Sequence, residues 1–428
     1  MAPLPPGEID KLSQAAALLH QAERPLRILK NIAWPKEVSQ TFFENGAREL
    51  PDPHYVPVDP RPVREAIAAA RTMIDGSSPV HDWLERTAAV LELSAGMLAS
   101  VGTAEFTRWS VDLFGAPGIA HIDQKARPID LARNLDTVLS EFDHCDLTSG
   151  RAPHVMTAQE LGARMEPRIR TVFGDDAPPI HIVDTLSAKA VAGGSYIKLR
   201  ADAEFSDLDT AQLVQHEAFV HIATSYNGRA QTTFPILGAG HPGTTRTQEG
   251  LAVLAELVSG VNDPARMRRL ADRVLAIDMA MEGADFLDLY RFFLERTGSE
   301  TESFENARRV VRGGLVTGGA PFTKDGVYLG GLIRVYNYMR AAVTRGEARH
   351  IRLLFAGKFD LDDMPAILAL EESGLIEPPR YLPPWAEDLR ALVSYLAFAR
   401  FIGDVDLASI DRHYDDLLGE GSKTDGAP

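Results

Sequence analysis

The stretch QHEAFVH at residues 215–221 decides how the middle of this chain folds. Its two imidazoles flank a carboxylate, and a further carboxylate, Glu249, follows in TQEGLA at residues 247–252. Two neutral imidazoles and one carboxylate are the ligand set of a catalytic zinc ion, which keeps its fourth position open for water. Glu217 stands where zinc peptidases place the general base that takes a proton from that water. The pattern therefore predicts a catalytic Zn²⁺ site.

The two histidines, His216 and His221, are separated by an unusual interval of i, i+5. On a regular α-helix with 3.6 residues per turn, their Cβ atoms point about 140° apart. A π-type turn, with its i to i+5 hydrogen bond, is wider, and such turns are frequent at functional sites. A shared metal therefore requires a helix that is locally wound wider between the two residues. The alternative is that the two rings diverge and share no function.

The flanking sequence favours the metal site. Ser206 and Asp207 supply an N-cap to a strongly apolar helix, in which the histidines and Glu217 are polar interruptions. A buried carboxylate is costly unless it is paired or lies beside a metal. After residues 227–243, which are rich in turn-forming glycine and proline, Glu249 falls in the first turn of a second helix. Without the histidines, Glu249 would be interpreted as a residue that satisfies the helix dipole.

Three motifs carry a resemblance to a known family: residues 215–231, QEGLA at 248–252 and FTKDGVYL at 322–329. In this order they resemble the QEGLA-motif family, which is labelled in bacteria as modulating flavohaemoglobin expression. That family is similar in its core to the animal microtubule-associated tyrosine carboxypeptidases, which are zinc enzymes. The resemblance covers roughly residues 150 to 400, and the first 150 residues carry no matching motif.

By this resemblance His216, His221 and Glu249 bind Zn²⁺, and Glu217 is the catalytic acid/base. The implied activity is that of a metallo-carboxypeptidase, and the implied substrate is a peptide or protein C-terminus. The resemblance leaves the identity of that substrate open, because many bacterial members have no tubulin to act on.

Length, composition and net charge limit the classes of protein to which the chain can belong. The chain has 428 residues, of which 45% are hydrophobic and 24% charged, as in a soluble globular protein of about two domains. The net charge of −16 argues against binding to nucleic acid or anionic membranes, and against a very acidic substrate unless local basic residues override it. No uncharged apolar run is long enough to span a membrane, and the first residues lack a signal-peptide pattern. A single cysteine, Cys145, suits a reducing cytoplasm.

The expected fold class is α+β and mainly helical. We expect an N-terminal helical region at 1–150, a zinc-peptidase-like catalytic domain at 151–415 with a small β-sheet and the ligand-bearing helix pair, and a disordered tail at 416–428. A strand at 180–183 is expected to pair with a strand at 195–200 around a turn at 192–194, and the second strand would offer an edge to an extended substrate. Helical patterns fall near 10–34, 35–50, 62–74, 80–101, 103–114, 128–143, 263–280, 284–297, 301–312, 325–345, 361–375 and 385–402.

Four further residues are candidates for contacting substrate. Tyr328 and Lys324 lie four residues apart and share a helical face, so they could stabilise an oxyanion or bind a carboxylate. The alternative is a solvated helix start beside a partly buried tyrosine. Arg229 and Arg246 are the other cations near the motifs, and each could instead brace a loop.

Two other features are interpreted as structural. The run RRVVR at 308–312 fits a solvated helix face. His241, in the loop between the two ligand helices, could approach the site as a proton donor, but an imidazole without that role is the favoured interpretation.

The sequence as a whole favours a zinc-dependent hydrolase of peptide bonds. The competing hypotheses are a non-catalytic zinc-containing protein that regulates or binds a partner, and a hydrolase of non-peptide amides. A structural zinc site has four protein ligands, usually with cysteine, and this region contains no cysteine. A catalytic site is therefore favoured over a structural one.

Overall fold

A computed structural model describes residues 5–120, 126–143, 145, 154–184, 186 and 188–405. The described chain is mainly helical with one small mixed sheet, which confirms the expected fold class. The boundary expected near residue 150 stays a prediction, and the tail expected at 416–428 lies outside the described residues. No described helix is long and apolar enough to cross a membrane.

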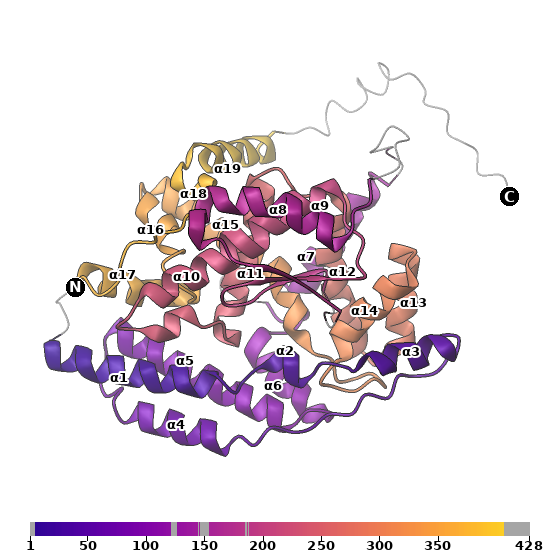
Figure 1. Ribbon diagram of the computed structural model, residues 1–428, viewed down its shortest axis with the longest axis horizontal. Helices are drawn as coiled ribbons and strands as arrows, with labels where there is room; N and C mark the ends of the chain where they lie inside the picture. Colours follow the sequence, from indigo (N-terminus) through magenta and orange to yellow (C-terminus); the bar gives the residue numbers. More distant parts are fainter. Residues whose placement is uncertain are drawn as a thin grey trace.

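The N-terminal part is a layer of helices along one side of the molecule, drawn in indigo and purple in Figure 1. One expectation was wrong here, because the helix expected over 10–34 ends at Glu23. Pro25 follows, and the residue before a proline is driven out of the helical region. The helices of this layer are α1 (Pro6–Glu23), α2 (Ile28–Asn31), α3 (Lys36–Glu44), α4 (Arg61–Arg71), α5 (Pro79–Ala99) and α6 (Ala104–Phe114), whereas α7 (Pro128–Ser140) packs against α12 (Pro264–Met281) in the middle of the molecule.

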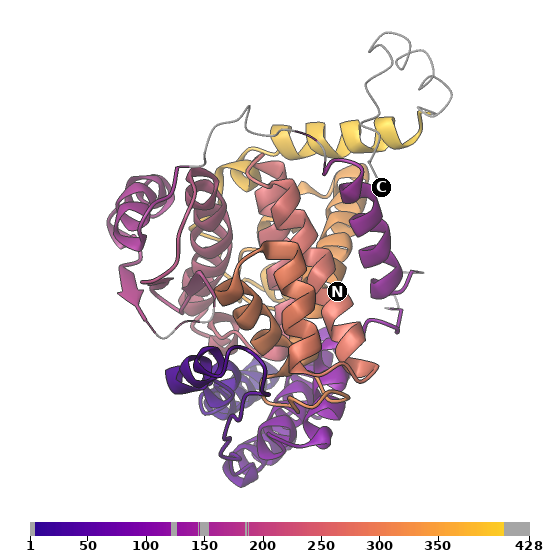
Figure 2. The ribbon, with the colours of Figure 1, turned by 90° about the vertical axis from the view of Figure 1, so that its right-hand side faces the viewer.

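The rest of the chain supplies the centre and the opposite side of the molecule. In Figure 2, α19 lies at the end of the molecule opposite the N-terminal helices, and the helices of the middle of the chain stand between them. The α-helices are α8 (Ala158–Phe173), α9 (Asp207–Leu213), α10 (Ala223–Ala230), α11 (Pro242–Val258), α12 (Pro264–Met281), α13 (Phe286–Thr297), α14 (Glu300–Val311), α15 (Val327–Thr344), α16 (Ala348–Leu353), α17 (Met364–Glu372), α18 (Pro384–Glu387) and α19 (Arg390–Gly403).

The expected pairing of the strand at 180–183 with the strand at 195–200 is confirmed, but the two strands are parallel and a third strand, which was not expected, lies on the other side of the second. The strands of the sheet are β1 (Ile180–Val183), β2 (Ala190–Ala192) and β3 (Ile197–Arg200), in the order β1-β3-β2. The turn at 192–194 joins β2 to β3, and β1 pairs with β3 in parallel. The expectation that the strand at 195–200 offers a free edge was therefore wrong, because β3 is paired on both sides. The edge near the ligand helix belongs to β2.

The second motif helix, α11, lies in the centre of the main hydrophobic core, where residues 251–255 are fully buried. Gly250 makes this position possible. A Cβ added to it would lie 2.2 Å from the backbone of Gly331 in α15. Only a glycine permits two helices to approach so closely. The glycine of the QEGLA motif therefore holds α11 against α15, and this contact fixes where the neighbouring Glu249 points.

Candidate metal centre

The helix that carries the two histidines is wound as a π-helix from Val214 to Ile222, between α9 and α10. This confirms the prediction of a locally wider helix. The imidazole rings of His216 and His221 consequently lie side by side, with centroids 4.9 Å apart and planes inclined at 82°. Ser206 begins the helix, since its side chain accepts a hydrogen bond from the backbone N–H of Asp209. The local fold thus turns an i, i+5 spacing into a convergent pair.

Glu249 completes the cluster. Its Oε2 lies 3.4 Å from Nε2 of His216 and 3.5 Å from Nε2 of His221. Ligand atoms bound tetrahedrally to zinc at about 2.0–2.1 Å are about 3.3 Å apart. No other group of three histidine, cysteine or acidic side chains with metal-ligand spacing was found among the described residues. The cluster therefore has the dimensions of a three-ligand zinc site.

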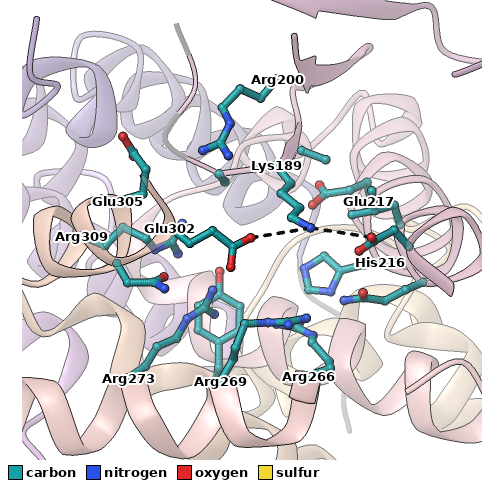
Figure 3. Close-up of a pocket in the computed structure, with 17 residues that line it drawn as sticks. Lys189, Arg200, His216, Glu217, Arg266, Arg269, Arg273, Glu302, Glu305 and Arg309 are labelled. Atoms are coloured by element: carbon teal, nitrogen blue, oxygen red, sulfur yellow. Dashed lines mark ion pairs between the residues drawn. The ribbon is translucent and has the colours of Figure 1, made fainter. Parts of the chain in front are cut away.

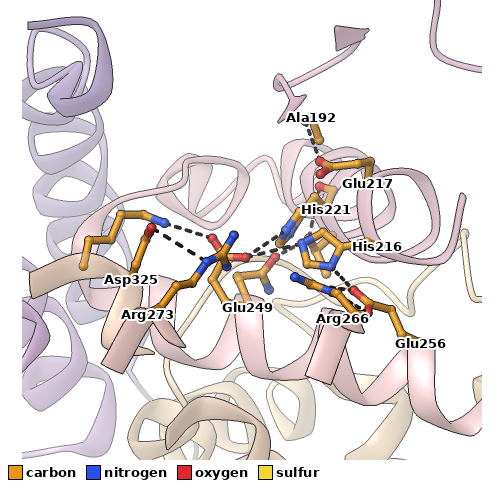
Figure 4. Close-up of polar contacts among 12 residues, drawn as sticks. Ala192, His216, Glu217, His221, Glu249, Glu256, Arg266, Arg273 and Asp325 are labelled. Atoms are coloured by element: carbon orange, nitrogen blue, oxygen red, sulfur yellow. Dashed lines mark hydrogen bonds and ion pairs between the residues drawn. The ribbon is translucent and has the colours of Figure 1, made fainter. Parts of the chain in front are cut away.

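The surroundings of Glu249 also fit a metal. Its Oε2 is buried and makes no hydrogen bond of ordinary geometry, whereas Oε1 accepts a hydrogen bond from Nζ of Lys324 at 3.1 Å. Burial would raise the pKa of Glu249, but the charge of Lys324 and the contacts with the two histidines hold it well below its usual value. An ionised carboxylate thus directs an unsatisfied oxygen toward two imidazole nitrogens (Figure 4). A divalent cation would satisfy that oxygen.

His216 is held from its other side. Its Nδ1 lies 2.7 Å from Oε1 of Glu256, a carboxylate that is 0% exposed. Burial would lower the pKa of His216, but its contacts with Glu249 and Glu256 raise it to about 10. The sequence analysis missed Glu256, which lies seven residues after Glu249 on α11 and therefore on the same helical face.

Glu217 lies on the π-helical segment beside the histidines. One of its oxygens, Oε2, accepts a hydrogen bond of 2.6 Å from the backbone N–H of Ala192, at the end of β2. The side chain lines, together with that of His216, a cavity of about 160 Å³ (Figure 3). A carboxylate with one anchored oxygen, beside a metal-sized cluster and a cavity, has the arrangement expected of a general base.

More basic than acidic side chains line the cavity, although the chain as a whole is acidic. In Figure 3, Arg266, Arg269 and Arg273 extend toward the cavity from α12. The cavity contains six basic side chains against four acidic ones: Lys189, Arg200, Arg266, Arg269, Arg273 and Arg309 against Asp209, Glu217, Glu302 and Glu305. A local excess of basic side chains is the condition under which an acidic substrate is compatible with an acidic chain.

The interpretation of residues 308–312 as a solvated helix face was wrong. Arg309 and Arg312 are 8% and 5% exposed, and Arg309 lines the cavity. Arg309 donates two hydrogen bonds to the buried carboxylate of Asp325, which compensates its charge. A sequence signal for the cationic wall did exist, because the α12 arginines recur at intervals of three and four residues, which places them on one helical face.

Two cations near the site have no anionic partner. The side chain of Arg269 forms no hydrogen bond or ion pair with any described residue, and burial lowers its pKa. Lys358 is likewise unpaired among the described residues, and burial lowers its pKa to about 8 while the charges of Glu249 and Glu217 act in the opposite direction. Neither residue could be predicted from the sequence, since nothing in the local pattern reveals a missing partner.

A comparison with protein-family models matches residues 40–404 to "Microtubule-associated tyrosine carboxypeptidase". This chain belongs to the microtubule-associated tyrosine carboxypeptidase family. The resemblance noted in the sequence is thereby confirmed, and the match extends it into the N-terminal helices, where no motif had been recognised. Membership assigns the chain to a family of peptidases. No curated protein matches the chain.

Two of the residues expected to bind the substrate, Tyr328 and Lys324, lie beside the metal cluster of this family member. Tyr328 lines the cavity, and its ring lies 4.5 Å from the guanidinium of Arg273 and 5.3 Å from Nζ of Lys324. Tyr328 and Lys324 lie close together as expected, although Lys324 belongs to a 3-10 turn (Thr323–Gly326) that precedes α15. Lys324, however, points to Glu249, with which it is ion-paired. In this arrangement Lys324 supports a candidate metal ligand, and its role in substrate binding stays a prediction.

The other expected residues lie away from the cavity of this family member. Arg229 is exposed, and its guanidinium packs against Gly194 in the β2–β3 turn. Arg246 donates a hydrogen bond to the carbonyl of Phe114 in α6. His241 is buried at the N-terminus of α11 with an unpartnered Nδ1, and burial lowers its pKa to about 4. None of the three lines the cavity beside His216, so their parts in binding or catalysis stay predictions.

Proposed function

We propose that this protein is a zinc-dependent carboxypeptidase that removes a residue from the C-terminus of a peptide or protein. The observation that carries the proposal is the convergence of His216, His221 and Glu249 beside Glu217, at the edge of a cationic cavity. Family membership supports the peptidase class, and the geometry supports the zinc dependence.

The three ligands would hold the ion through Nε2 of His216, Nε2 of His221 and Oε2 of Glu249. A bound zinc ion supplies a lowered pKa for water and polarises the carbonyl that is attacked. Lys324 keeps Oε1 of Glu249 occupied, so that this carboxylate presents a single oxygen to the ion. A site with three protein ligands leaves a position open for the reaction, as a catalytic site requires.

Glu217 moves the proton. The hydrogen bond from Ala192 anchors Oε2, and the second oxygen of Glu217 stays available to the attacking water. As the water oxygen bonds to the carbonyl carbon, its proton passes to Glu217. When the C–N bond breaks, Glu217 delivers that proton to the leaving nitrogen. Tyr328 is the candidate donor to the oxyanion, because it lines the same cavity and its hydroxyl has no partner among the described residues.

The unpaired cation in the cavity supports an exopeptidase. A terminal carboxylate needs a charged donor, and a guanidinium binds it with two parallel hydrogen bonds. Arg269 is suited to this task because its charge is not already neutralised by a neighbouring carboxylate. The remaining cations of the wall would favour acidic residues next to the terminus, and the family name points to tyrosine as the residue removed.

The test compares two peptides that end in the same tyrosine, one with a free terminal carboxylate and one with a terminal amide. The free acid should be shortened by one residue and the amide left nearly intact, as followed by mass spectrometry. Equal cleavage of both, or cleavage inside the peptide, would contradict a carboxypeptidase. Absence of peptide cleavage by a zinc-loaded protein would favour a regulatory role or a non-peptide amide as substrate.

A further inference from the structure

The buried carboxylate of Glu256 is fully engaged by its neighbours (Figure 4). Its Oε1 contacts Nδ1 of His216 at 2.7 Å and accepts a hydrogen bond from Nη2 of Arg266 at 2.9 Å. Its Oε2 accepts hydrogen bonds from Nε of Arg266 at 3.0 Å and from Nδ2 of Asn262 at 3.3 Å. His216 is thus the only one of these partners that belongs to the metal cluster.

This contact fixes the tautomer of the histidine. A carboxylate held by a bidentate arginine has no proton to donate, so the hydrogen between Glu256 and His216 belongs to Nδ1. When a metal ion takes the place of the proton on Nε2, the lone pair of that nitrogen, which faces Glu249, is the one offered to the ion. The ring cannot flip without breaking a short, charge-assisted hydrogen bond in a buried site.

From this geometry we infer that Glu256 is a positioning residue for the zinc ligand His216, and that the two hydrogen bonds from Arg266 hold its carboxylate in place. The inference rests on the proposed zinc site. Mutation of a residue that orients a metal-bound histidine in this manner typically lowers metal affinity by about 10- to 100-fold.

Stability alone gives a poor account of this arrangement. Glu256 is 0% exposed and Arg266 is 6% exposed, so both charges have been removed from water. Well-packed apolar side chains of similar size often replace a buried ion pair without loss of stability. The arrangement has a positional consequence instead, because the carboxylate of the pair reaches Nδ1 of His216, a residue of the metal cluster. Arg266 also lines the cavity, and the pair therefore connects the ligand to the cationic wall.

The test is the zinc affinity of Glu256→Gln, measured by competition with a chromophoric chelator, beside the melting temperature of the zinc-free protein. Glutamine keeps the length of the side chain but loses the charge that Arg266 supports. Zinc affinity should fall at least about 10-fold. Asp272→Asn is the matched control, because Asp272 is a 5% exposed carboxylate on α12 that accepts a hydrogen bond from Arg296 and contacts no metal ligand. Its loss should lower the melting temperature and leave zinc affinity within about twofold.

A zinc affinity of Glu256→Gln within about twofold of wild type would overturn the inference. If that variant does not fold, Glu256→Asp takes its place, since it keeps a carboxylate for Arg266 but withdraws it from His216, and the same loss of affinity is expected. A wild-type protein that binds no zinc would refute the proposed function itself. The two failures are therefore distinguishable.

Discussion

Replacement of Lys358 by methionine should stabilise the folded protein and weaken its binding of a peptide substrate. The ammonium group of Lys358 forms no hydrogen bond or ion pair with a described residue, and burial lowers its pKa from 10.5 to about 8. Its loop is rigidly held two residues further on, where Asp360 accepts hydrogen bonds from Arg334 at 2.8 Å and Thr247 at 3.0 Å. The charge therefore cannot easily escape to solvent, and keeping it there costs free energy.

The size of that cost follows from the difference between the two pKa values. At about 1.4 kcal/mol per pKa unit, it corresponds to about 3 kcal/mol at neutral pH. Because the group retains some exposure to solvent, Lys358→Met should raise the free energy of unfolding by about 1–3 kcal/mol at pH 7. Below pH 8 both states of wild type hold the proton and the cost is complete. Between pH 8 and 10.5 only the unfolded state holds it, so wild-type stability rises through this window and the stability of the variant does not.

The assay is urea unfolding of wild type, Lys358→Met and the exposed-site control Lys30→Met, in the presence of a metal chelator, at pH 7 and pH 9.5. Peptide hydrolysis is then measured with the zinc-loaded proteins. An unpaired cation near Glu217 and Glu249 is suited to an anionic substrate, so the KM of the variant should increase several-fold. A Lys358→Met protein less stable than wild type at pH 7, or a stability difference independent of pH, would refute the reasoning.

Three further outcomes are expected. Arg269→Met should raise KM for a free-acid peptide about 10- to 100-fold, with a smaller change in kcat. The control is Arg268→Met, which removes an ion-paired arginine next to Arg269 on α12 and should leave KM unchanged. Similar KM values for the two variants would argue against Arg269 as the carboxylate ligand. Glu249→Ala should reduce zinc affinity by more than about 100-fold, and an unchanged affinity would remove Glu249 from the ligand set. Gly250→Ala should lower the free energy of unfolding by about 2–3 kcal/mol in denaturant titration, because the added Cβ would lie 2.2 Å from Gly331, and a neutral substitution would contradict the close contact of α11 with α15.

The sequence alone predicts those parts of the site that depend on local geometry. The i, i+5 spacing of His216 and His221 requires a wider helix, and residues 214–222 form one. The class of the fold follows from the helical periodicity, and the end of α1 would have followed from Pro25. The pairing of residues 180–183 with 197–200 was predicted, but β2 was missed, because a glycine turn does not specify which strands it joins.

The parts that were missed depend on long-range packing. Glu256, Arg269 and Lys358 acquire their significance from the presence or absence of a partner in another element. Arg309 was interpreted as part of a solvated helix face because the run at 308–312 carries three arginines, yet it is buried against Asp325, sixteen residues away. A buried charge reveals its role only when the compensating group is known.

The central claim is that His216, His221 and Glu249 hold a zinc ion for which Glu217 acts as the base. Zinc content per chain, measured together with peptide turnover in wild type and Glu217→Gln, tests it most directly. Glutamine preserves the size of the side chain and can still accept the hydrogen bond from Ala192. We predict one zinc ion per chain in both proteins, with turnover lost in the variant. A wild-type protein without zinc, or a Glu217→Gln protein with unchanged turnover, would contradict the account.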